Sequence, residues 1–218
     1  MIPVTIVDNF FNDPYKIREF ALLQEFERHD GASWPGLRTK MLLDLDSNMY
    51  NLFVDKLLSV FFNLPNDHIG CNVDVFFQYT TATYEEGWIH TDTGVSFAGV
   101  IYLTPTPAID SGTLIYQENC ITRDYDQYPK VEFYNGLTTN VAAYRDLRNT
   151  HNLKFTKTLD VSNVFNRMVI FSGEEWHREN KFFGSNINDS RLTLVFFVNL
   201  KTYNNTNTPI IRLKNIIL

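Results

Sequence analysis

Cysteine is scarce in this 218-residue chain, and its two cysteines, Cys71 and Cys120, form no CxxC pair. Such a count suggests neither a disulfide scaffold nor a structural zinc site, and it is typical of a reducing compartment. The chain also lacks any apolar run near the roughly 20 residues that a membrane-spanning helix needs. Its first residues have neither the basic start nor the long apolar core of a signal peptide. We therefore expect a cytoplasmic protein with no membrane partner.

Positive charge is in short supply as well. Lys and Arg number 19 against 25 Asp and Glu, which gives a net charge of −6. Because a phosphate backbone is bound by a broad basic surface, this balance disfavours nucleic acid as a partner. Hydrophobic residues, in contrast, make up 44% of the chain and aromatic residues 15%. That content is enough for the core of one compact domain.

The order of patterns along the chain predicts helices first and strands later. Asp13 and Pro14 mark the start of a helix expected over about 14–27, and a second amphipathic helix is expected over about 48–63. From residue 71 onward, short runs such as "SFAGVIYL", "NRMVIF" and "RLTLVFFVNL" are rich in β-branched and aromatic residues. The last run is apolar on both alternating faces, which predicts a strand covered on both sides. We expect an α+β fold with helices on one face of a largely antiparallel sheet.

These patterns are interpreted as one domain spanning residues 1–218. It would comprise a helical support over about 1–70, a β core over about 71–200 with an insertion over about 118–163, and a tail over 201–218. The insertion is polar and aromatic by turns and has no clear period. Insertions of this length are usually lids, interfaces or disordered loops.

The segment "GWIHTDTGVSF" places His90 and Asp92 two residues apart, just before an apolar strand. In an extended backbone these two side chains share one face, so they could bind the same metal ion. They could equally be ordinary polar residues at the mouth of a strand, because an HxD pattern often occurs by chance. His177 follows another apolar strand and is the best third ligand, although alone it could be a capping or surface histidine. Two imidazoles and one carboxylate suit Fe(II).

A zinc hydrolase could use a similar ligand set with one open water position. Glu174 or Glu175 would then act as the general base for the bound water.

Arg191 opens the apolar strand "RLTLVFF", and Thr193 lies two residues on and faces the same way. An arginine in such a strand is costly unless it meets an anion. It could reach solvent or a structural carboxylate at the strand end. Alternatively, it could clamp the carboxylate of a ligand, with the hydroxyl of Thr193 assisting.

The order and spacing of these pieces resemble the Fe(II)- and 2-oxoglutarate-dependent oxygenases, in their prolyl-hydroxylase-like branch. The similar segments are "FAGVIYLTPTPAIDSGTLIY", "VFNRMVIFSGEEWHREN" and "SRLTLVFFVN", together with the HxD segment. With their flanks they cover about residues 73–117 and 164–200. The resemblance implies a double-stranded β-helix core of the jelly-roll or cupin type, with the N-terminal helices packed on one sheet.

The resemblance also implies the activity and the roles of individual residues. The activity would be that of a dioxygenase that uses Fe(II), 2-oxoglutarate and O2 to hydroxylate an unidentified small-molecule or peptide substrate, with release of succinate and CO2. His90, Asp92 and His177 would be the catalytic metal ligands. Arg191 would pair with the distal carboxylate of 2-oxoglutarate, with Tyr102 or Thr193 as further candidates for the same carboxylate.

Two features depart from the family pattern. Arg191 lies 14 residues after His177, a longer gap than usual, so the loop between them must bulge if the arginine is assigned correctly. Ser111 precedes Gly112 where the family often has a second glycine. A non-catalytic double-stranded β-helix that binds a ligand or takes part in an assembly therefore stays open as the alternative, and a zinc hydrolase as a lesser one.

The segment "SWPGLRT" raises a further question, since Trp34 and Arg38 bracket a Pro-Gly turn. They could be a packed tryptophan beside an exposed arginine. They could also belong to a loop that folds over the mouth of the pocket and contacts the substrate.

Overall fold

A computed structural model describes residues 4–64, 69–119, 130–134 and 141–203. Most of the expected C-terminal tail, together with Cys120, lies outside the described residues. The elements are β1 (Thr5–Val7), α1 (Pro14–Leu22), β2 (Leu37–Arg38), α2 (Leu42–Leu45), α3 (Ser47–Leu58), β3 (Ile69–Thr80), the 3-10 turn η1 (Ala82–Tyr84), β4 (Phe97–Tyr102), β5 (Thr113–Glu118), α4 (Lys130–Tyr134), α5 (Val141–Asn152), β6 (Phe155–Val161), β7 (Met168–Ser172), β8 (Trp176–Glu179) and β9 (Arg191–Tyr203).

Helix α1 begins as the sequence predicts, because the side chain of Asp13 accepts a hydrogen bond from the backbone N–H of Lys16. Both α1 and α3 end five residues before the ends predicted from hydrophobic spacing. Polar side chains near each end donate hydrogen bonds to helix carbonyls. The Gln24 amide donates to the carbonyl of Phe20, and the Ser59 hydroxyl donates to the carbonyl of Lys56 in α3. These bonds satisfy carbonyls that the helices leave open at their C-termini.

The strands form two antiparallel sheets. The larger has six strands in the order β1-β7-β4-β9-β3-β2, and the smaller has three in the order β6-β5-β8. Strand β9 lies between β3 and β4. Its residues Leu194 and Phe196 pack in the core that contains the helices, whereas Val195 and Phe197 face the cavity described below. The prediction of an α+β fold with a strand covered on both faces is confirmed.

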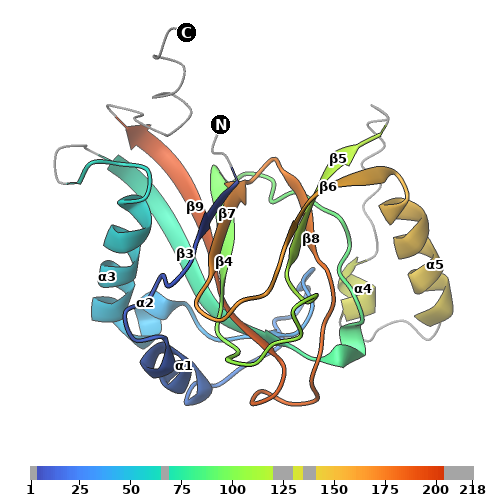
Figure 1. Cartoon of the computed structure of the whole chain (residues 1–218), viewed down its shortest axis with the longest axis horizontal. Coiled ribbons are helices and arrows are strands. Elements are labelled where there is room, and N and C mark those ends of the chain that lie inside the picture. The colour runs from blue at the N-terminus through green and yellow to red at the C-terminus, as the bar shows by residue number, and fades with distance from the viewer. Residues whose placement is uncertain (1–3, 65–68, 120–129, 135–140, 204–218) are drawn as a thin grey trace, which may run out of the picture.

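The N-terminal helices α1, α2 and α3 cover the outer face of the large sheet (Figure 1). Phe53 and Leu57 of α3 are buried against it, and the Phe53 ring lies 5.7 Å from that of Phe196. Burying each such side chain contributes roughly 1.5–3 kcal/mol. This packing leaves the inner face of the sheet to form the cavity with the small sheet.

The segment 118–163, interpreted from sequence as an insertion, is partly built into the fold. Its described part contains α4, α5 and β6, and β6 adds an edge strand to β5 of the small sheet. Figure 1 shows α4 and α5 on the side of the molecule opposite α3. The sequence pattern hid these elements because β6 alternates little, with five consecutive exposed residues between two buried ends.

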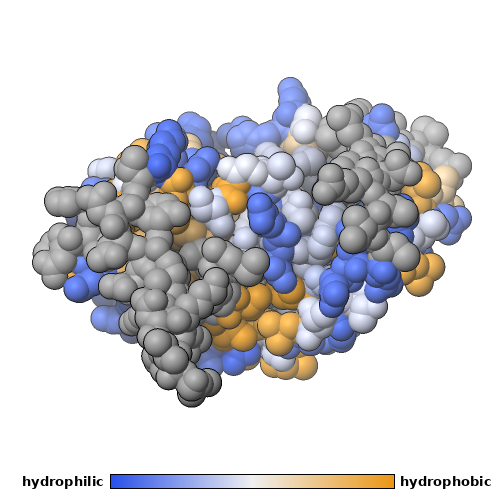
Figure 2. Space-filling view, turned by 90° about the horizontal axis from the view of Figure 1, so that it is seen from above, coloured by the Kyte–Doolittle hydropathy of each residue, from blue (hydrophilic) through white to orange (hydrophobic). Residues whose placement is uncertain are grey.

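The outer surface is mixed in character. On the face seen from above, hydrophilic residues cover much of the coloured surface and a group of hydrophobic residues gathers among them (Figure 2). Among the described residues, every helix is too short or too polar to cross a membrane.

Candidate metal centre

His90 and His177 come from distant parts of the chain but lie side by side. His90 is in the extended segment before β4, and its backbone pairs with that of His177 in β8. Each residue donates its N–H to the other's carbonyl, at 2.9 Å in both directions. The two imidazole rings consequently lie 4.4 Å apart between centroids. An isolated bridge of two backbones thus aligns two histidines that are far apart in sequence.

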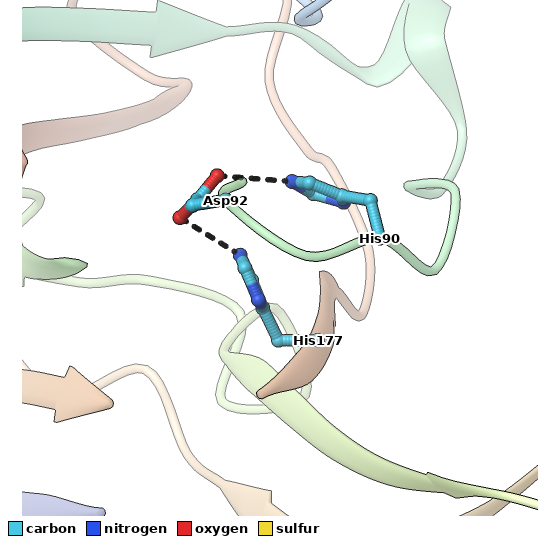
Figure 3. Close-up of side chains that lie close together, drawn as sticks. All are labelled: His90, Asp92 and His177. Carbon is cyan, nitrogen blue, oxygen red and sulfur yellow. Dashed lines mark ion pairs between the residues drawn. The ribbon is translucent and has the colours of Figure 1, made fainter. Parts of the chain in front are cut away.

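The carboxylate of Asp92 faces both rings (Figure 3). One of its oxygens lies 3.8 Å from Nε2 of His90, and the other lies 3.5 Å from Nε2 of His177. The three ligand atoms all lie within 4.8 Å of one another. Atoms that share one ion at about 2.1 Å must lie within about 4.2 Å of each other, so this arrangement is near that required by a single metal ion.

The hydrogen bonds of the two rings also suit metal binding. Nδ1 of His90 lies 2.8 Å from the carbonyl of Trp88, and Nδ1 of His177 lies 2.8 Å from the carbonyl of Glu175. Because a carbonyl only accepts, each Nδ1 donates a proton, and in a neutral ring this leaves the lone pair of Nε2 on the side of Asp92. Such partners commonly orient metal-binding histidines. Here both partners are backbone carbonyls two residues upstream, which sequence reasoning did not identify.

A glycine allows the backbone of Asp92 to approach the turn after β7. The Asp92 N–H donates to the carbonyl of Gly173 at 2.8 Å. A Cβ atom at Gly173 would lie 2.3 Å from the carbonyl oxygen of Val95. Since no real Cβ makes such a contact, a larger residue would displace the segment that carries the carboxylate.

Helix α5 holds the segment that leads to His90. The side chain of Asn152 accepts from the N–H of Ile89 at 3.0 Å and donates to the carbonyl of Gly87 at 3.3 Å. Nε2 of the buried His151 lies 2.7 Å from the carbonyl of Ile89. The polar sequence around His151 is typical of a solvated loop, yet the residue lies buried near the end of α5. No local signal could have revealed its role, because the contact joins residues 62 positions apart.

The three candidate ligands line a cavity of about 510 Å³ between the two sheets. This volume falls in the range of small-molecule sites. The cavity wall also contains Arg38 and Arg191, apolar residues of β4, β7 and β9, and Tyr134 of α4. The insertion therefore contributes both to the wall and to the support of the site.

Arg191 is buried, with 3% of its surface exposed, and lines this cavity. Its Nε donates to the carbonyl of Ser111 at 3.1 Å, and its guanidinium lies 5.4 Å from the centre of the Tyr102 ring. Within the described part of the chain, no carboxylate approaches this guanidinium closely enough to form an ion pair. The long loop after His177 does not prevent Arg191 from reaching the cavity.

Tyr102 and Thr193 lie next to the cavity rather than in its wall. The Tyr102 hydroxyl is 2.7 Å from that of Thr113, which does line the cavity. Burial raises the pKa of the Tyr102 phenol, an effect that the charge of Arg191 partly opposes. The Thr193 hydroxyl donates to the carbonyl of Gln78 at 3.3 Å. The roles of Tyr102 and Thr193 toward a co-substrate stay predictions. The hydroxyl proton of Thr193 is already donated to the protein backbone.

Of the other residues singled out from the sequence, some line the cavity and some do not. Trp34 and Arg38 both line the cavity. Glu174 and Glu175, the candidate bases of the zinc-hydrolase alternative, are not among the residues that line it.

Several solved structures share the fold. HygX from Streptomyces hygroscopicus, with nickel and 2-oxoglutarate bound, is 10% identical over 91% of this chain and 83% of its own, with a TM-score of 0.56. A 2OG-Fe(II) oxygenase family oxidoreductase from Burkholderia pseudomallei is 11% identical over 90% and 84%, with a TM-score of 0.50. The epimerase SnoN from nogalamycin biosynthesis, described as non-heme and alpha-ketoglutarate dependent, is 12% identical over 99% and 85%, also with a TM-score of 0.50. The predicted double-stranded β-helix fold is confirmed.

Sequence comparison gives a separate result. No curated protein matches the chain. One family model matches residues 1–198, and its description is "Family of unknown function (DUF6445)". Since this match spans nearly the whole chain, the protein belongs to the DUF6445 family.

Proposed function

We propose that this protein is an Fe(II)- and 2-oxoglutarate-dependent dioxygenase that hydroxylates a small-molecule or peptide substrate. The observation that carries the proposal is that the His90–Asp92–His177 cluster and the buried Arg191 line one cavity. The metal ligands and a guanidinium that forms no ion pair with the described residues are the two features that a keto-diacid co-substrate requires. The shared fold with oxygenases supports the same class but does not by itself assign an activity.

The donor set fits Fe(II). Two neutral imidazoles and one carboxylate form a mixed N/O set, and three ligands on one side leave coordination positions open to small molecules. When bound with 2-oxoglutarate and O2, the iron supplies oxidative decarboxylation to succinate and CO2 and oxidation of a substrate C–H bond. Asp92 offsets part of the positive charge of the metal. The carbonyls of Trp88 and Glu175 fix the orientation of the two rings.

We assign Arg191 to the distal carboxylate of the co-substrate. Its Nε donates to the carbonyl of Ser111 and its side chain also bonds the Tyr102 hydroxyl, and the remaining N–H groups can form a charge-assisted pair. The hydroxyl of Thr113, also in the wall, is a second donor in the same region. Apolar side chains in the wall, among them Val195 and Phe171, exclude water from the reacting groups.

The structure gives less support to the two alternatives. The bases that the sequence offered to a zinc hydrolase were Glu174 and Glu175, and neither lines the cavity. A non-catalytic binding module would not require a metal cluster and a buried guanidinium to face the same space. We therefore propose neither.

The proposal is tested by turnover without substrate. Purified protein supplied with Fe(II), 2-oxoglutarate and O2 should release succinate slowly. We expect His90→Ala to abolish this release. Arg191→Ala should lower kcat/KM for 2-oxoglutarate by about 10²-fold, because it removes a charge-assisted pair worth near 3 kcal/mol.

The matched control is Arg145→Ala, which removes an exposed guanidinium of α5 that pairs with Glu85 outside the cavity. This variant should keep the rate of the unmodified protein. Absence of succinate, together with no anaerobic binding of 2-oxoglutarate to the Fe(II)-loaded protein in calorimetry, would refute the proposal.

A further inference from the structure

We propose that Arg38 is a second anion-binding residue of the cavity and that it receives a carboxylate group of the substrate. This inference rests on the proposed function, in which Arg191 and the metal hold 2-oxoglutarate. It goes further by naming the chemical class of the substrate, a small molecule or peptide with a free carboxylate.

Three arginines line the cavity, and one of them, Arg178, already pairs with Glu86. The other two have separate surroundings. Arg191 begins β9 and contacts Ser111 and Tyr102. Arg38 lies on the edge strand β2 and contacts Trp34 and Phe197. Since they share none of these contacts, one diacid bound at Arg191 leaves the second guanidinium for another ligand.

Arg38 is held so that its terminal nitrogens remain for a ligand. Its Nε donates to the side-chain oxygen of Gln78 at 2.7 Å. The amide of Gln78 is oriented in turn, because its nitrogen donates to the carbonyl of Pro35 at 2.8 Å. Among the described residues, no acceptor bonds the terminal nitrogens of Arg38, and no carboxylate lies within 4.0 Å of them. Both terminal NH2 groups of this guanidinium are therefore available to a ligand, and no described carboxylate forms an ion pair with them.

Aromatic rings surround this guanidinium. Its central carbon lies 4.1 Å from the Trp34 ring centre, 5.3 Å from that of Phe197 and 5.6 Å from that of Phe76. Burial lowers the pKa of Arg38 to about 10, so the group is still charged at neutral pH. The rings compensate only part of the lost hydration. An anion placed on the two remaining donors would supply the rest.

The loop that carries this arrangement is fixed without any ligand. Arg28 donates to the carbonyls of Trp34, Gly36 and Ala32. Gly36 has a φ of +79°, and a Cβ there would lie 2.2 Å from the carbonyl oxygen of Tyr79. Binding at Arg38 would therefore require little ordering of the loop.

Trp34 provides an independent sign of a missing partner. Its indole Nε1 is buried and donates no hydrogen bond to any of the described residues. Buried donors are nearly always satisfied in proteins. The unsatisfied indole lies in the residue that stacks on Arg38, in the wall of the same cavity.

The charges around the cavity favour a carboxylate over a phosphate. Asp74 and Glu179 line it in addition to Asp92, and the carboxylates of Asp92 and Glu179 act electrostatically on Arg38. At Arg38 these groups would repel a phosphate dianion more strongly than a carboxylate, which carries one negative charge. A planar carboxylate also matches the planar fork of the arginine.

Side-chain NMR tests the proposal on the whole protein. The sample is Zn(II)-loaded, saturated with 2-oxoglutarate and labelled with ¹⁵N in arginine and tryptophan, with signals assigned from single-residue variants. Sodium acetate and sodium propionate are then titrated at constant ionic strength. We expect saturable shifts of the Arg38 Nε–H and the Trp34 indole N–H, with little change at Arg191. Propionamide, which has the same shape without the charge, should produce neither shift, and inorganic phosphate should produce weaker ones.

Matched variants control for folding and charge. In Arg38→Gln the acetate-induced shift of the Trp34 signal should disappear. In Lys40→Gln, which removes one positive charge at an exposed position two residues away, the shift should remain. If Arg38→Gln does not fold, the titration of the unmodified protein still decides the question.

Three outcomes would overturn the proposal: no response of Arg38 and Trp34 to either acid, an equal response to propionamide, or a shift of Arg38 instead of Arg191 when 2-oxoglutarate itself is added. The last would make Arg38 the co-substrate clamp. A failure of the proposed function gives a different result, since 2-oxoglutarate would then shift neither arginine while the acetate titration still reports on Arg38.

Discussion

The hydroxyl of Tyr102 connects the buried guanidinium of Arg191 to the wall of the cavity. It lies 2.7 Å from the hydroxyl of Thr113, while its ring lies beside the guanidinium. Burial raises the pKa of this phenol, so it keeps its proton at neutral pH and can act as a donor. Tyr102 therefore holds the Arg191 guanidinium in position from outside the cavity wall, even if it does not contact the co-substrate.

We predict that Tyr102→Phe weakens the binding of 2-oxoglutarate by about 5–10-fold, which corresponds to the loss of roughly one hydrogen bond. Affinity for Fe(II) should not change, because the metal ligands are untouched. Anaerobic calorimetry measures both constants. The control is Tyr50→Phe, which removes a bond of 2.9 Å to the carbonyl of Val73, outside the cavity wall. Equal affinities in the two variants would mean that Tyr102 is a packing residue only.

The sequence identified residues whose signals are local. The two-residue spacing of His90 and Asp92, and an arginine at the start of an apolar strand, are visible without knowledge of the fold. Asn152 escaped notice because its contact with Ile89 spans 63 positions. Arg38 could not be interpreted with certainty because its strand, β2, has only two residues and no hydrophobic pattern.

At the level of elements, helix α5 acts as a brace for the metal site. Its last residues bond both backbone groups of Ile89, immediately before His90. The helix was missed in the sequence because its segment is polar, with only Arg148 and His151 buried. Buried polar residues bond the segment before His90 here, in place of the apolar stripe that would mark a core helix.

We predict that Asn152→Ala lowers the affinity for Fe(II) by about 10-fold, as is usual when a residue that orients a metal ligand is removed. Fe(II) titration under anaerobic conditions measures the effect. Asn149→Ala, one turn earlier at an exposed position, should leave the affinity unchanged. The same loss in both variants would indicate general weakening of the helix rather than positioning of His90.

Strand β1 is tied to β7 by an ion pair beside their paired ends. Arg167 donates to both oxygens of Asp8, at 2.6 and 3.0 Å. This hydrogen bonding holds the pKa of Asp8 below its ordinary value. The pair therefore stabilises the folded state above the usual pKa of an aspartate, and this contribution is lost as the pH falls through the lowered pKa.

We predict that Asp8→Asn lowers the free energy of unfolding at neutral pH by less than about 1 kcal/mol, since Asp8 is largely exposed and the pair is screened by solvent. The difference from the unmodified protein should shrink as the pH is lowered through the acid range, because Asp8 becomes protonated there. Urea unfolding at a series of pH values measures it. A difference that stays constant down to strongly acidic pH would show that the charge of Asp8 does not matter.

At the scale of the whole molecule, the candidate site joins the two sheets. His90 and Asp92 lead into β4 of the large sheet, Arg191 begins β9 of the same sheet, and His177 lies on β8 of the small one. Sequence patterns could place these residues at strand ends but could not pair the strands across the fold. The pairing of the strands brings these four residues, each marked by a local sequence signal, into the wall of one cavity.

A metal ion bound to both sheets should stabilise the folded state by mass action. At a concentration 100 times its Kd, Zn(II) or Mn(II) would contribute about 2.7 kcal/mol. For a chain of this size that raises Tm by roughly 5–10 °C. Adding 2-oxoglutarate should raise Tm further, but only when the metal is present, because the co-substrate binds partly through it.

The variants separate the two increments in a thermal-shift experiment. His177→Ala should lose both, whereas Arg191→Ala should keep the metal increment and lose the one from 2-oxoglutarate. Lys40→Gln should keep both, since Lys40 is exposed and outside the cavity wall. A stabilisation by 2-oxoglutarate that is equally large without metal would contradict a shared site, because the diacid would then bind to the protein independently of the His90–Asp92–His177 cluster.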